Sequence, residues 1–166
     1  MNLSLTIANL NEAALISDLR NNAAQHLTEQ YGKGQWSYHT NEKTVINSMT
    51  GKSKVLVTKN NDEIVGTLCL QTKKPWAIDA SYFTKVVQPL YLVDMAIQPS
   101  WQRKGIGSYM LHEVKPFVIS WPAEAIRLDA YDAESGAGGF YRKSGYTERG
   151  RVIYKGDPLI YFEMLI

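Results

Sequence analysis

Residues 97–107 carry the side chains and spacing best suited to chemistry in this chain. They read Ile-Gln-Pro-Ser-Trp-Gln-Arg-Lys-Gly-Ile-Gly and join an apolar run to a helical pattern. Gly105 and Gly107 remove side chains where a ligand could approach the main chain. The first turn of a helix has unpaired N–H groups and a partial positive charge, which favour an anion. Because Arg103 and Lys104 add full positive charge there, the segment predicts a phosphate or pyrophosphate site.

The glycine spacing narrows the choice of anion-binding motif. It matches neither a Walker loop nor the Gly-x-Gly-x-x-Gly dinucleotide pattern, but it fits Gln/Arg-x-x-Gly-x-Gly, starting at Gln102. A second motif follows at residues 139–146, Gly-Phe-Tyr-Arg-Lys-Ser-Gly-Tyr. With the preceding apolar strand, which ends in Ile97-Gln98-Pro99, these motifs resemble the acetyl-CoA-binding elements of the GNAT superfamily of N-acetyltransferases. The resemblance covers residues 54–166, and residues 1–53 fit it only by element order.

This resemblance implies where acetyl-CoA binds. The pantetheine arm would pair like a short extra strand with residues 95–97, and a main-chain N–H there would polarise the thioester carbonyl. Gln102 opens the motif, and the pyrophosphate would sit on the main-chain amides that follow it. The residues implied are Met95, Ala96, Ile97, Gln102, Arg103, Lys104, Gly105, Ile106, Gly107 and Ser108.

The resemblance also implies a general acid. Tyr141 matches the family's tyrosine near the CoA sulfur, and an ordinary tyrosine keeps its proton at neutral pH. The sequence departs from the family at Glu134, where an asparagine often contacts the pantetheine arm. That glutamate could cap the following helix or lean toward the acceptor amine.

The general base is left open among Asp94, Glu134, Tyr91 and a water relay. Asp94 is the only charged residue in the apolar run of residues 90–97. Strand alternation places it on the face opposite Tyr91, Val93 and Met95. A buried carboxylate there could act as a base, although a structural aspartate bonded to a neighbouring loop is the stronger expectation.

The remaining reactive residues show no second centre. Cys69 is expected to be a small core residue, and the three histidines lack metal-ligand spacing, so we expect no metal. An aromatic set in predicted loops could line an acceptor pocket: Trp36, Tyr38, Trp76, Tyr82 and Phe83.

The hydrophobic pattern predicts the elements that position these residues. We expect strands at residues 3–7, 54–58, 63–72, 90–97, 125–131, 149–154 and 159–165. Helices are expected at residues 11–30, 41–49, 104–116 and 134–143, the first with its apolar face at residues 14, 15, 19, 23, 24 and 27. This order indicates an α/β (α+β mixed) fold. The order indicates a mixed sheet with helices on both faces. The GNAT resemblance implies that this sheet is mostly antiparallel, with six to seven strands and splayed central strands.

Composition sets the outer limits. The 166 residues, 45% apolar with a net charge of +2 and one cysteine, fit a single globular domain. The GNAT resemblance implies that residues 1–166 form a single N-acetyltransferase domain. In it, residues 1–53 form a variable acceptor side and residues 54–166 the acetyl-CoA-binding core. We expect no nucleic-acid partner, membrane span or signal peptide, and a cytoplasmic location. The apolar C-terminal strand leaves a homodimer open.

These observations predict an acetyl-CoA-dependent N-acetyltransferase that acts by direct attack of a primary amine of a small molecule or peptide. A non-catalytic acyl-CoA-binding or sensing module is the alternative on the same fold. The sequence does not decide the acceptor or the acyl chain length.

Overall fold

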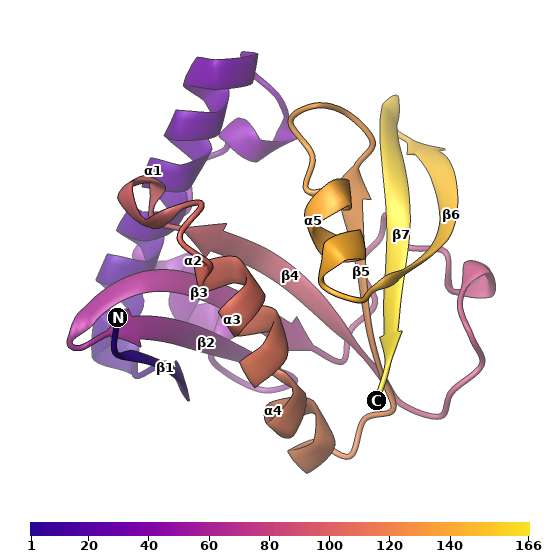
Figure 1. The fold of residues 1–166 in the computed structure, drawn as a ribbon, viewed down its shortest axis with the longest axis horizontal. Helices are drawn as coiled ribbons and strands as arrows, with labels where there is room; N and C mark the ends of the chain where they lie inside the picture. Colours follow the sequence, from indigo (N-terminus) through magenta and orange to yellow (C-terminus); the bar gives the residue numbers. More distant parts are fainter. The chain divides into compact units, whose positions relative to one another are not determined.

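The computed structural model describes residues 1–166. Its helices are α1 (Ala13–Tyr31), α2 (Glu42–Ser48), α3 (Ile106–Glu113), α4 (Lys115–Ser120) and α5 (Gly138–Lys143). Short 3-10 turns occupy Leu10–Glu12, Gln35–Ser37, Ala80–Tyr82 and Pro99–Trp101. The strands are β1 (Leu3–Ile7), β2 (Ser53–Asn60), β3 (Glu63–Gln71), β4 (Pro89–Ile97), β5 (Ala125–Tyr131), β6 (Thr147–Tyr154) and β7 (Asp157–Leu165), drawn with the helices in Figure 1.

The strands form one seven-stranded sheet in the order β1-β2-β3-β4-β5-β7-β6. β4 and β5 run in parallel, whereas β1–β2, β5–β7 and β6–β7 are antiparallel pairs. The predicted mixed, mostly antiparallel fold is therefore confirmed. The chain divides into two compact units, Met1–Leu70 with Val93–Val114, and Gln71–Leu92 with Lys115–Ile166. Each unit is described by itself.

The parallel ladder between β4 and β5 is short. It contains three pairs, Pro89–Ala125, Leu90–Ile126 and Tyr91–Arg127, whereas β5 pairs with β7 along its whole length. Residues 95–97 of β4 therefore lie beyond the last residue of β4 that pairs with β5.

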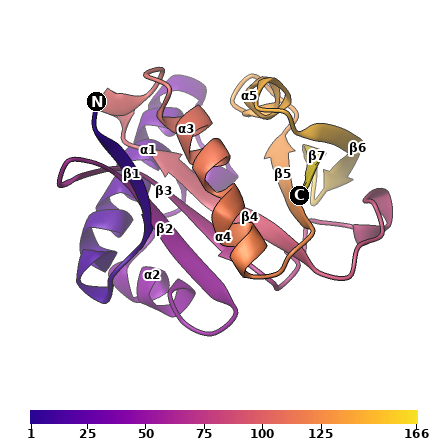
Figure 2. The same cartoon turned by 60° about the horizontal axis from the view of Figure 1, so that its bottom comes forward.

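In the first unit, helices cover both faces of the strands. One face packs against α1 and α2 through a buried cluster of small and β-branched side chains, namely Ala13, Ile16, Val45, Val55, Val57 and Cys69. On the other face a Cβ atom at Gly66 would lie 2.7 Å from the Met110 sulfur, because α3 packs closely over β3. Figures 1 and 2 show α3 and α1 on opposite sides of these strands.

The buried face of α1 differs from the prediction. Leu15, expected to face the core, is 58% exposed. Leu19 is buried as predicted. The helix also buries Ala13 and Ile16, which the predicted face left out, and the polar Ser17 and Arg20, which apolar spacing does not reveal.

In the second unit, β5, β7 and β6 are covered on one face by α5 and on the other by the β3–β4 loop. Loop residues Ile78 and Phe83 join Tyr91 and Tyr161 in a buried cluster. Beneath that loop, Arg127 Nε donates to Glu163 Oε2 at 3.0 Å, with both side chains buried.

Two predicted helix bounds are corrected. The helix expected at residues 104–116 is α3, followed by α4 to Ser120. Pro116 does not end the helical segment, because it lies in the first turn of α4, where its missing N–H is not needed. The last helix begins at Gly138 rather than Glu134, which lies in a turn.

The C-terminal strand is internal to the sheet. β7 lies between β5 and β6, and Leu159, Ile160, Tyr161 and Phe162 are buried there. Its apolar character is therefore explained within one chain. None of the helices has the length and hydrophobicity needed to cross a membrane.

Candidate active site

The predicted phosphate loop is an exposed turn that leads into α3. Its first helical bond runs from the Tyr109 N–H to the Gly105 carbonyl at 3.0 Å. The N–H groups of Ile106, Gly107 and Ser108 therefore precede the helical ladder. Gly105, with φ +83°, is the N-cap in the left-handed region, where glycine is favoured.

Two cationic side chains flank these amides. Arg103 and Lys104 are exposed, and Arg103 also has a positive φ of 58°. Lys104 Nζ lies 4.9 Å from the centre of the Trp101 ring. The turn therefore offers unused main-chain donors next to two full positive charges, which fits the pyrophosphate of CoA.

Side-chain hydrogen bonds hold the loop against the strands. Gln102 Nε2 donates to the Ile97 carbonyl at 3.3 Å, which ties the loop back to the end of β4. Trp101 Nε1 donates to Glu63 Oε1 at 3.1 Å, at the start of β3. Gln102 therefore has a local positioning role that the motif did not reveal.

The C-terminal part of β4 leads directly into this loop. Met95, Ala96 and Ile97 are half-buried, and the Gln98 N–H donates to the Val65 carbonyl of β3 at 3.0 Å. The first unit thus contains all the sequence-predicted cofactor residues: the end of β4, Gln102, and the amides from Arg103 to Ser108.

Asp94 departs from the expected strand alternation. Its φ is +53°, a conformation that non-glycine residues rarely adopt. Val93 packs against the α1–α2 cluster, and Asp94 bonds to Arg20 of α1, so consecutive residues face the same helix. The prediction that these two residues face opposite sides is wrong, because the backbone twists at Asp94.

The Asp94 carboxylate is partly exposed and has two partners. Arg20 NH1 donates to Oδ2 at 3.4 Å, and Tyr38 Oη donates to Oδ1 at 3.5 Å. Sequence reasoning missed Arg20; a charged residue at helical spacing from Ala13 and Ile16 was the available signal.

Tyr141 lies in the second unit and is buried. Its ring packs against Phe140, Tyr146 and Phe162, with centres 5.2, 5.8 and 5.7 Å away. Burial raises the pKa of Tyr141 far above its usual value, and the nearby Asp129 raises it further. The phenol therefore stays protonated throughout the physiological range.

The other two candidates for the general base, Glu134 and Tyr91, differ in burial and in their hydrogen bonds. Glu134 is exposed, and Ala137 is the N-cap of α5, so Glu134 does not cap that helix. Tyr91 is buried, and its hydroxyl accepts a bond from Arg127 NH1 at 3.5 Å.

Cys69 is a core residue, as predicted. It is 1% exposed, and burial raises the pKa of its thiol to about 12. Such a thiol is a poor nucleophile at neutral pH. No group of three or more His, Cys, Asp or Glu residues could hold a metal ion.

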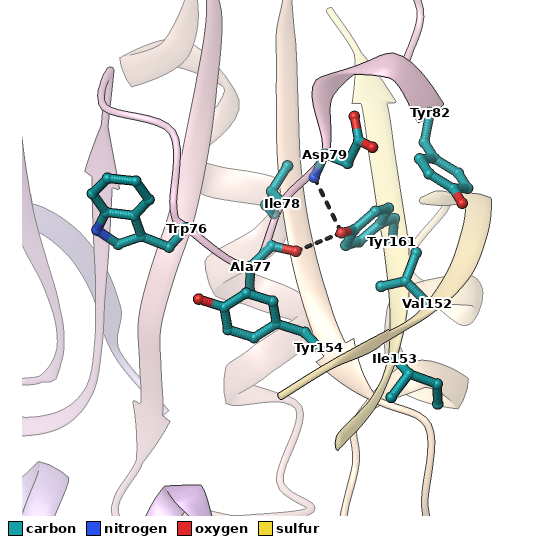
Figure 3. A pocket seen from close by; sticks show the side chains of 9 residues that line it. All are labelled: Trp76, Ala77, Ile78, Asp79, Tyr82, Val152, Ile153, Tyr154 and Tyr161. Carbon is teal, nitrogen blue, oxygen red and sulfur yellow. Dashed lines mark hydrogen bonds between the residues drawn. The ribbon is translucent and has the colours of Figure 1, made fainter. Parts of the chain in front are cut away.

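The predicted aromatic set divides between the units. Trp36 and Tyr38 belong to the first unit, and Trp76, Tyr82 and Phe83 to the second. Trp76 and Tyr82 line a hollow of about 290 Å³ beside the β6–β7 hairpin (Figure 3). At its base Tyr161 Oη donates to the Ala77 carbonyl and accepts from the Asp79 N–H at 3.1 Å. Phe83 is instead part of the buried cluster.

Comparison with known proteins decides the family. The sequence profile described as the acetyltransferase (GNAT) domain matches residues 51–148, more than half of the chain. The chain belongs to the GNAT acetyltransferases. Enzymes of this family use acetyl-CoA as a co-substrate. No curated protein sequence matches the chain.

Solved GNAT structures share this fold at low sequence identity. YncA, a putative acetyltransferase from Salmonella typhimurium with acetyl-CoA, has a TM-score of 0.74 at 13% identity, covering 99% of this chain and 94% of that one. The aminoglycoside 6'-acetyltransferase type Ii has a TM-score of 0.69 at 18% identity, covering 98% and 96%. The ribosomal-protein-S18-alanine N-acetyltransferase from Escherichia coli has a TM-score of 0.71 at 13% identity, covering 99% and 94%.

Proposed function

We propose that this GNAT protein is an N-acetyltransferase that moves an acetyl group from acetyl-CoA to a primary amine. The amine nitrogen forms a bond to the acetyl carbon, and the carbon–sulfur bond of the thioester breaks. The products are the N-acetyl compound, CoA with its thiol protonated, and one proton released from the original ammonium. The observation that carries the proposal is the cationic turn at the start of α3, directly after the end of β4.

The residues of the first unit would bind the donor. The amides from Arg103 to Ser108 would hold the pyrophosphate, with Gln102 keeping the turn in place through Ile97. Residues 95–97 would pair with the pantetheine arm, and a main-chain N–H there would stabilise the developing oxyanion. Binding would thus use the main chain more than side chains.

Tyr141 would protonate the departing thiolate. A general acid must carry its proton at the working pH, and the raised pKa of this phenol ensures that it does. Direct attack requires no nucleophile of the protein, in keeping with the inert thiol of Cys69.

The acceptor would be a small molecule or a peptide N-terminus, with residues 1–53 shaping its side of a single domain. The structural relatives act on different amines, an aminoglycoside in one case and a ribosomal protein alanine in another. A cytoplasmic location and a homodimer remain predictions.

The test is an acetyl-transfer assay with a panel of primary amines, comparing the parent protein with Tyr141→Phe. We expect amine-dependent release of CoA thiol and an acetylated amine detected by mass spectrometry. General acid catalysis contributes about a hundredfold or more, so kcat should fall by about that factor in the variant. Acetyl-CoA affinity should change little.

Tyr146→Phe, which removes the hydroxyl of a neighbouring buried ring, is the matched control and should keep its activity. A parent protein that binds acetyl-CoA and acetylates no amine would contradict the enzyme and favour the acyl-CoA sensor.

A further inference from the structure

Arg20 is a buried cation whose hydrogen-bonding capacity is largely unused. Its side chain is 7% exposed and makes one bond, from NH1 to Asp94 Oδ2 at 3.4 Å. Its Nε and NH2 atoms are buried with no hydrogen-bond partner. A guanidinium has five donors, and leaving them unpaired away from water is costly, so such a group calls for an explanation.

Asp94 is the second unusual residue at this place. It has the positive φ of a strained residue, and such backbone strain is concentrated at functional sites. The twist turns its carboxylate toward α1, while about one third of the side chain, 34%, stays exposed. Asp94 directly precedes residues 95–97, the stretch proposed to bind the reacting end of acetyl-CoA.

The neighbouring loop is fixed so that Tyr38 completes the group. Asn21 of α1 donates from Nδ2 to the Thr40 carbonyl at 2.8 Å and accepts from the Thr40 N–H at 2.8 Å. This pair of hydrogen bonds anchors the loop at Thr40, two residues after Tyr38. The Tyr38 hydroxyl in turn donates to Asp94. The three side chains therefore come from α1, its following loop and β4, all within the first unit.

We propose that Arg20 and Asp94 form the acceptor subsite, and that it selects small amines with a carboxylate next to the amine, as in a free α-amino acid. The ammonium of the acceptor approaches the partly exposed carboxylate of Asp94, beside residues 95–97. The Arg20 guanidinium breaks its 3.4 Å hydrogen bond to Asp94 and donates instead to the carboxylate of the acceptor. A zwitterion thus matches both charges of the pair. This inference rests on the proposed acetyltransferase function and names its acceptor class.

A peptide N-terminus is disfavoured by the same chemistry. Its α-amine is followed by a neutral carbonyl, which offers Arg20 no negative charge, whereas charged acceptors form the stronger hydrogen bonds. A merely structural ion pair would show no preference between acceptors that differ only in this carboxylate.

The experiment compares matched acceptors with the parent protein: free amino acids of several side-chain types, their α-amides, and the corresponding decarboxylated amines. We expect kcat/KM for at least one free acid to exceed that of its amide and its amine by about tenfold or more. Equal or better turnover of the amides or amines would overturn the acceptor class and leave the acetyltransferase function standing. If no amine of any kind is acetylated, the proposed function fails, and the subsite fails with it.

Variants then assign the preference to the pair. Arg20→Gln should raise KM for the free acid by more than it raises KM for the decarboxylated amine, so that the preference for the free acid is lost. Lys33→Gln, on the exposed loop after α1, is the control and should keep it. An acetyl-CoA melting shift like the parent's shows that a variant is folded. A parallel loss with both acceptors in a folded Arg20→Gln protein would overturn the role of Arg20.

Should Arg20→Gln fail to fold, Asp94→Asn keeps the shape and removes the charge that meets the ammonium. It should lower kcat/KM for the free acid at least as much as for its amide. Unchanged turnover of the free acid would overturn the subsite.

Discussion

At the scale of single residues, several polar side-chain atoms of this protein are buried without a hydrogen-bond partner. The Tyr146 hydroxyl is buried and makes no hydrogen bond, whereas the equally buried Tyr161 bonds through its hydroxyl to Ala77 and Asp79. An unsatisfied hydroxyl costs free energy, and a satisfied one stabilises. The two tyrosines therefore make opposite predictions for the same chemical change.

Tyr146→Phe should leave the free energy of unfolding unchanged or raise it by up to about 1 kcal/mol. Tyr161→Phe, the matched control, should lower it by about 1–2 kcal/mol because two main-chain groups lose their partner. Urea unfolding followed by circular dichroism measures both. A larger loss in Tyr146→Phe than in Tyr161→Phe would show that the Tyr146 hydroxyl has a bonding partner.

At the scale of elements, a buried ion pair within the second unit helps to hold the β3–β4 loop against β5 and β7. Glu163 of β7 accepts from Arg127 Nε, and the Thr84 N–H donates to its Oε1 at 3.2 Å. Arg127 NH2 in turn donates to the Thr84 carbonyl. The two charges therefore hold both main-chain groups of one loop residue.

Glu163→Gln should destabilise the fold by about 3 kcal/mol, because it leaves the Arg127 charge buried and uncompensated. The exposed pair of Arg151 and Asp132, at 2.9 Å, is the control. Asp132→Asn should cost less than about 1 kcal/mol. The ratio of the two losses in chemical denaturation is the readout, and similar losses would mean that Arg127 finds solvent or another partner.

Comparing the elements shows which features could be predicted from the sequence. The cationic turn before α3 was predictable because Arg103, Lys104 and Gly105 are contiguous and the helix start is a local property. The contact of Arg20 with Asp94 was not, because the two residues are 74 positions apart. The side-chain direction predicted for Asp94 from strand alternation was wrong, because its backbone is left-handed. The buried face predicted for α1 from apolar spacing missed the polar residues Ser17 and Arg20. The mostly antiparallel character of the sheet followed from the GNAT resemblance rather than from any single segment.

At the scale of the whole molecule, the buried tyrosines couple stability to alkaline pH. Burial raises the pKa of both Tyr141 and Tyr146 in the folded state, while an unfolded tyrosine has a pKa near ~10. Below about pH 10 both states hold these protons, and the contribution to stability is fully present. Above it the unfolded state loses its protons first, so stability falls as pH rises.

The double variant Tyr141→Phe/Tyr146→Phe should therefore unfold at a higher pH than the parent protein. Urea midpoints measured from pH 7 to 11 would show parallel behaviour at the neutral end and a shallower decline in the variant at the alkaline end. An identical alkaline decline in both proteins would assign it to other groups.

The most direct test of the whole account is the melting temperature as a function of acetyl-CoA concentration. A ligand that binds only the folded state raises that temperature with concentration. The parent protein should show this rise, and so should Lys43→Glu, a charge reversal at an exposed position of α2. Arg103→Glu/Lys104→Glu should lose most of it, because the cationic turn then repels the pyrophosphate. No rise in the parent, or an undiminished rise in the double variant, would contradict the claim that this turn binds acetyl-CoA.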